Sequence, residues 1–98
     1  MKSAPRLAIE AAEMLAIQAL GFIAAEPERL EAFLAATGLT LERLRESATE
    51  PDFLAGVLEH MLADESLLLA FADSAAIDPA AVARARNALG RNWERDLP

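Results

Sequence analysis

The segment DESLLLAFADSAA at residues 64–76 is the most informative part of this chain. Asp64 is a suitable N-cap, and most of the residues that follow it are good helix formers. Three consecutive leucines, Leu67 to Leu69, cover about 200° of the helix circumference at roughly 100° per residue. A helix with so wide an apolar arc has no broad face to offer to water. We therefore predict that residues 65–75 form the central, most buried helix of the fold.

The composition around this segment is typical of an all-α protein. Hydrophobic residues make up 54% of the 98 positions, but only 5% of the positions are aromatic. Alanine and leucine carry the apolar character, and both are strong helix formers. No segment alternates apolar and polar residues as a half-buried strand would. A chain of this length forms one core, so we predict a single compact all-α domain over residues 1–98, with five or six short helices.

Local signals place the ends of these helices. Prolines and capping side chains mark the starts, and glycines mark two of the ends. The predicted helices run from about Arg6 to Ala24, from Glu26-Pro27 to Gly38, from Thr40 onward, from Pro51 or Asp52 onward, from Asp64 onward, and from Asp78-Pro79 to Gly90. We expect residues 1–4 and 91–98 to be frayed.

The charge and the absence of cysteine narrow the possible functions. A net charge of −7 repels phosphate backbones and anionic membranes. Without cysteine the chain has no disulfide, thiolate metal site or cysteine nucleophile, which favours a reducing compartment. Glu10 and Glu13 interrupt the apolar run near the N-terminus, so we expect neither a signal peptide nor a membrane span. We predict a cytoplasmic protein.

The sequence offers little material for catalysis or metal binding. His60 is the only histidine, and Glu59, Asp64 and Glu65 near it suggest a carboxylate–imidazole metal site. Zinc sites usually need three or four ligands, several of them His or Cys. No G-x-S-x-G nucleophile motif and no glycine-rich phosphate loop is present. We predict no catalytic, metal or cofactor site and interpret His60 as a surface or boundary residue; an enzyme centred on it is the remote alternative.

Residues 33–47 have the outline of a DNA-reading helix-turn-helix, with Gly38 in the turn. Such a motif needs cations for phosphates and donors for base edges. Arg43 and Arg45 are available, but two glutamates on the same helix cancel their charge. We interpret this segment as a helix corner that contributes Leu41 to the core.

A second corner at residues 71–89 is the better nucleic-acid candidate on charge alone. Arg84, Arg86 and Arg91 lie along its second helix or just beyond it. Arginine near a helix C-terminus is also ordinary, because the helix dipole favours cations there. No aromatic residues are interleaved to stack bases. A nucleic-acid-associated factor that uses one of the two corners is therefore the alternative function.

The first helix carries the leading functional interpretation. Its alanines allow another helix to approach closely, and its apolar arc is wider than a six-helix domain needs. This predicts self-association or docking onto a partner helix, unless the helix lies in the middle of its own bundle. The chain is then a small non-enzymatic protein-interaction module with a protein partner or a second copy.

Six short motifs together suggest a family. They are GL at Gly38-Leu39, LR at Leu44-Arg45, P-x-FL at Pro51 to Leu54, VLEHML at Val57 to Leu62, DE-x-LLL-x-FA at Asp64 to Ala72, and ARNALG at the end of the last helix. Over roughly residues 26–90 the chain resembles short bacterial proteins classed as domain of unknown function 3572. The DE-x-LLL-x-FA block is the most specific part. The resemblance implies an all-α domain without assigned activity and transfers no functional residues.

Overall fold

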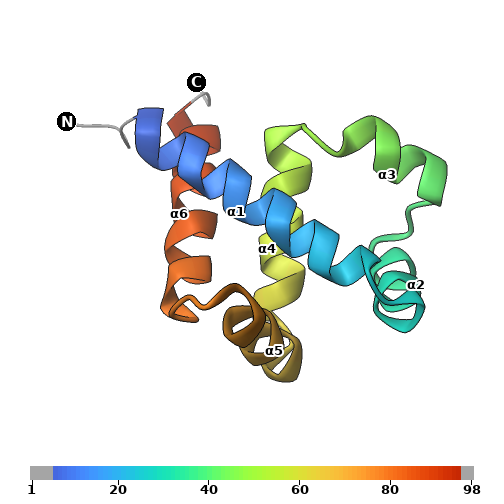
Figure 1. Cartoon of the computed structure of the whole chain (residues 1–98). Coiled ribbons are helices and arrows are strands. Elements are labelled where there is room, and N and C mark those ends of the chain that lie inside the picture. The colour runs from blue at the N-terminus through green and yellow to red at the C-terminus, as the bar shows by residue number, and fades with distance from the viewer. Residues whose placement is uncertain (1–5, 96–98) are drawn as a thin grey trace.

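A computed structural model describes the backbone of residues 6–95 and the side chains of residues 8–89. Six helices make up this part of the chain (Figure 1): α1 (Arg6–Ala24), α2 (Pro27–Thr37), α3 (Leu41–Ser47), α4 (Pro51–Leu62), α5 (Glu65–Ala75) and α6 (Ala80–Arg95). No strand occurs among the described residues, which confirms the all-α prediction.

Most of the helix ends lie where the local signals predict them. Gly38 adopts a left-handed conformation with φ of 74°, and its N–H donates to the carbonyl of Leu34. Thr40 accepts the backbone N–H of the third residue after it at 3.1 Å, and Asp64 does the same at 3.2 Å. Both bonds satisfy N–H groups that have no partner within the helix. Prolines begin α2 and α4 as expected.

Helix α4 occupies the centre of the fold. It packs against α1, α5 and α6, while α1 also packs against α6 and α2. Helices α4 and α6 run in opposite directions, and α1 lies across both of them (Figure 1). The core therefore forms where these three helices meet. Its buried side chains there are Ala12, Ala16, Ala19, Leu20 and Ile23 of α1, Leu54, Val57, Leu58 and Met61 of α4, and Val82, Ala85 and Leu89 of α6.

The prediction that residues 65–75 form the central helix is wrong. Helix α5 lies at one end of α4 and buries only Phe71 and Ala72, while Leu69 is 49% exposed. Its triple leucine spreads over a wide arc, but neighbouring helices cover only part of that arc. A single exposed leucine is common on protein surfaces and costs little. The apolar residues of α4 recur at helical spacing between neighbours on several sides, so α4 takes the central position.

Helix α6 is longer than predicted. It continues through Gly90 to Arg95, although Gly90 was expected to end it. A glycine within a helix costs about 1 kcal/mol relative to alanine, which weakens a helix without ending it. The expected fraying of residues 1–4 and 96–98 concerns positions outside the described residues, and residues 91–95 belong to the helix.

Candidate functional site

Helix α1 carries apolar side chains on both of its sides. The side toward α4 and α6 is buried. On the outer side Met14 is 65% exposed and Ile17 is 48% exposed. Ala11, Met14 and Ile17 follow one another at intervals of three residues, so their side chains are neighbours on the helix surface. The helix therefore packs within its own bundle and also leaves an apolar row facing water.

An open groove of about 370 Å³ lies beside this row, between α1 and α6. Six of its eight lining residues are alanine, and their single methyl groups leave the space. The lining consists of Ala8, Ala11, Ala12 and Leu15 from α1 and Ala81, Arg84, Ala85 and Ala88 from α6. This groove together with Met14 and Ile17 is called the α1–α6 surface below.

The two arginines of α6 whose side chains are described have different surroundings. Arg86 donates from Nε to Oε2 of Glu59 at 2.8 Å, and its Nη2 contacts the same oxygen, which ties α6 to α4. Arg84 lines the groove, is exposed, and forms no ion pair with any described residue. Glu10 and Glu13 lie on α1 and likewise have no ion-pair partner in the described part. The α1–α6 surface thus has a cation in its groove and acids nearby.

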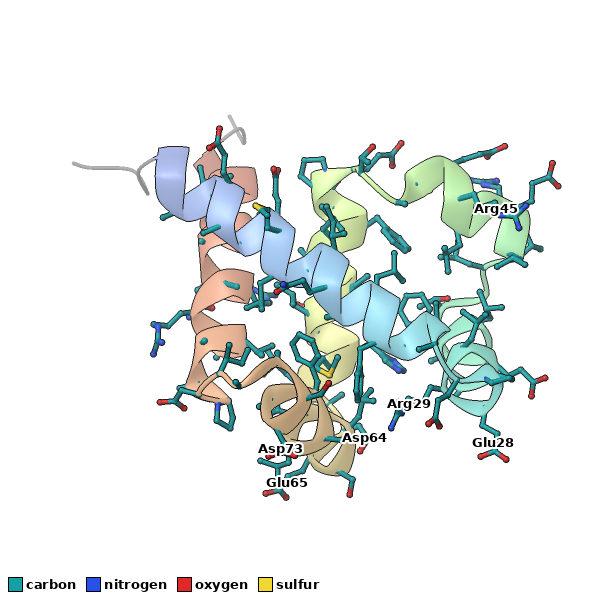
Figure 2. The ribbon with its side chains drawn as sticks, in the orientation of Figure 1. Glu28, Arg29, Arg45, Asp64, Glu65 and Asp73 are labelled. Carbon is teal, nitrogen blue, oxygen red and sulfur yellow. The ribbon has the colours of Figure 1, made fainter. Side chains whose placement is uncertain are left out.

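The arginines predicted as nucleic-acid or partner contacts do not lie together. Arg43 pairs with Glu46 of its own helix at 3.7 Å. Arg45 projects from α3, on the opposite side of the molecule from α6 (Figure 2). Arg84 belongs to α6, which lies on the opposite side of the fold from α3 (Figure 1), and the side chain of Arg91 lies outside the described residues. The two helix corners therefore do not combine into one basic surface.

His60 packs at the boundary of the helix bundle. It is half-buried on α4, and its ring meets that of Phe33 edge to face with centroids 5.0 Å apart. Of the two positions that the sequence predicts for it, surface or boundary, its half-buried side chain occupies the boundary. Within residues 8–89, no three His, Cys, Asp or Glu side chains come together in a group that could hold a metal ion.

The Gly38 corner positions α3 at the edge of the fold. Phe33 and Leu44 are buried on either side of the corner, as a structural corner requires. Leu41 was expected in the core, but it is 44% exposed. It occupies the first turn of α3, a short helix with few neighbours, so only the opposite side of the helix is covered.

The segments with the most specific sequence pattern have clear places in this fold. VLEHML forms the second half of α4, and DE-x-LLL-x-FA includes the cap and most of α5. The chain matches the family described as "Protein of unknown function (DUF3572)" over residues 9–92. It belongs to this family. No curated protein and no solved structure matches this DUF3572 member. The family description assigns no activity, so the function must be argued from the surface.

Met14 and Ile17 were not singled out by their sequence positions. On a helical wheel they fall among Glu10, Glu13 and Gln18, the residues that define the polar stripe of α1. Large apolar residues inside a polar stripe are the signal that could have identified them in this DUF3572 member. No single described helix is long and apolar enough to cross a membrane, although two bent helix pairs satisfy the same criteria when each pair is taken together.

Proposed function

We propose that this protein is a non-enzymatic interaction module whose α1–α6 surface binds an apolar helical segment of a protein partner. The exposure of Met14 and Ile17 beside the groove is the observation that carries this proposal. Removal of apolar surface from water is the dominant favourable contribution to most protein–protein association. Apolar side chains beside a groove are the usual elements of helix-in-groove recognition.

The shape of the groove supports a helix as the bound segment. Alanines line most of it, so the backbone of a partner helix can approach α1 and α6 closely. Met14 adapts its shape because its side chain is unbranched and flexible. A larger apolar side chain of the partner would fill the groove while Met14 and Ile17 pack against its flanks.

We propose that this module acts in the bacterial cytoplasm. The composition has no cysteine and a net charge of −7, which suits a soluble protein in a reducing compartment. The resemblance to short bacterial proteins supports the cytoplasm of a bacterium as this compartment. The net negative charge also disfavours anionic membranes as a docking partner.

Site-specific photo-crosslinking in living cells tests the proposal. A photoreactive amino acid replaces Ile17 in one strain and Leu69 in another, because both side chains are about half exposed. Leu69 lies on α5, away from the α1–α6 surface, and serves as the matched control. We expect a discrete protein adduct from position 17 and none from position 69. The same adducts at both positions, or none at either, would overturn the proposal.

The alternative is a nucleic-acid-associated factor that uses the corner of α5 and α6. The chain turns by 100° between these helices, within the range of about 90–120° found in helix-turn-helix motifs. Among the described arginines of α6, only Arg84 has no ion-pair partner. Affinity for nucleic acid grows with each neutralised phosphate, so one available arginine supports only weak binding. A gel-shift assay with mixed-sequence DNA tests this alternative. Salt-sensitive retention that is lost in Arg84→Ala would support it over the protein-interaction module.

A further inference from the structure

We infer that the helical segment bound by the α1–α6 surface is α1 of a second copy of this chain. The inference rests on the proposed function and names its partner. In the dimer the two α1 helices lie side by side and parallel, related by a two-fold axis that runs along them. Ile17 of each copy then lies beside the Leu15 end of the groove of the other.

The two edges of α1 differ in shape. Successive residues of a helix are about 100° apart, so Ala11 and Leu15 lie on one edge of the exposed side. Glu10 and Ile17 lie on the other edge, and Met14 lies between the two edges. The first edge borders the groove, and the second presents Ile17, which is 48% exposed. A protruding apolar side chain and the rim of a groove therefore lie on opposite edges of the same helix, which makes this surface complementary to itself across a two-fold axis.

Symmetry determines which edges meet. A two-fold axis parallel to α1 keeps the direction of the helix and exchanges the two edges of its exposed side. The Ile17 edge of one copy therefore faces the groove edge of the other. An axis perpendicular to α1 within the interface would place groove against groove. In that case Arg84 would face Arg84 of the second copy, and Glu10 would face Glu10.

The charges on this surface favour the parallel arrangement. Arg84 lines the same groove as Ala8, Ala11, Ala12 and Leu15, and these α1 residues span the level of Glu10 and Glu13 along the helix. In the parallel dimer Arg84 of each copy faces these glutamates of the other copy. None of the three side chains has an ion-pair partner among the described residues, so the dimer gives them one. Complementary charges of this kind set the orientation of an interface.

Light scattering and sedimentation of the purified full chain at tens of micromolar test the assembly state. We expect twice the 10.5 kDa mass of one chain for the wild type. Ile17→Glu should give the single-chain mass with an unchanged circular dichroism spectrum and melting temperature, because Ile17 is already half exposed. Leu69→Glu, the matched change on α5, should remain dimeric.

Charge reversal tests the arrangement. Arg84→Glu alone and the pair Glu10→Arg with Glu13→Arg should each raise the dimer dissociation constant about tenfold or more. The variant with all three changes should recover the wild-type dimer, because the new carboxylate at position 84 would then face the new guanidinium groups at positions 10 and 13. In an arrangement with groove against groove, like charges already face each other in the wild type, so these charge reversals should change the dissociation constant little.

The outcomes separate this inference from the proposed function. A folded triple variant that does not recover overturns the parallel arrangement. If the wild type has the single-chain mass and position 17 crosslinks to a different protein in cells, a second copy of this chain is ruled out as the partner. The proposed interaction module is then retained. Loss of every specific adduct at position 17 overturns both.

Discussion

Phe33 and His60 meet edge to face, with ring centroids 5.0 Å apart and ring planes at 86°. The contact joins α2 to the central α4. Phe33 is only 1% exposed, and a second edge-to-face contact with Phe53 lies on the same ring at 6.1 Å. The single histidine of this chain therefore has a packing role between two helices.

Replacement of His60 with alanine should lower the free energy of unfolding by about 1–2 kcal/mol, because an edge-to-face pair contributes about 0.5–1.5 kcal/mol beyond its buried area. Urea denaturation followed by circular dichroism measures the change. His60→Phe preserves the ring and should stay within about 0.5 kcal/mol of the wild type. An increase in stability on addition of zinc to the wild type, absent in both variants, would contradict a purely packing role.

Two leucine truncations compare the burial of α4 and α5. Leu58→Ala on α4 removes a fully buried side chain and should cost about 2–5 kcal/mol. Leu69→Ala on α5 removes a side chain that is 49% exposed and should cost less than about 1 kcal/mol. Denaturant midpoints of the two variants give the comparison. Equal losses would mean that α5 is as central as its triple leucine predicts.

Ala76 offers a stabilising substitution. It caps the C-terminus of α5 with φ of 58°, a left-handed conformation that is strained for alanine. Ala76→Gly should relieve this strain and raise stability by about 1 kcal/mol, or roughly 4–8 °C in melting temperature for a domain of this size. Ala75→Gly, one residue earlier within the helix, is the control and should lower stability by about 1 kcal/mol. Thermal melts of the two variants should therefore shift in opposite directions.

Asp64 and Asp73 lie near opposite ends of α5. Asp64 accepts the N–H of Leu67, so Asp64→Ala should cost about 1 kcal/mol. Asp73 lies in the last turn, where the helix dipole disfavours an anion, so Asp73→Ala should raise stability by about 0.3–0.5 kcal/mol. Denaturation at low ionic strength should resolve both effects. A similar loss in both variants would rule out the capping and dipole explanation.

Helix boundaries could largely be predicted because they depend on nearby residues. Gly38 ends α2 through its own left-handed backbone, and Thr40 and Asp64 cap helices three residues away. The exception is Gly90, which lies within α6 because neighbouring residues continue the helix. The candidate arginines could be identified from the sequence as charged residues, but their ion-pair partners could not. Arg86 pairs with Glu59, which is 27 positions away in the chain.

The sequence by itself determined the all-α class, the positions of the turns and the family, because caps, propensities and motifs act over a few residues. Tertiary structure alone decided which apolar residues are buried, because burial depends on the helices that pack around each position. It placed α4 at the centre in place of α5. It also left Met14 and Ile17 exposed beside the groove of α1 and α6, which is the surface that supports the proposed function.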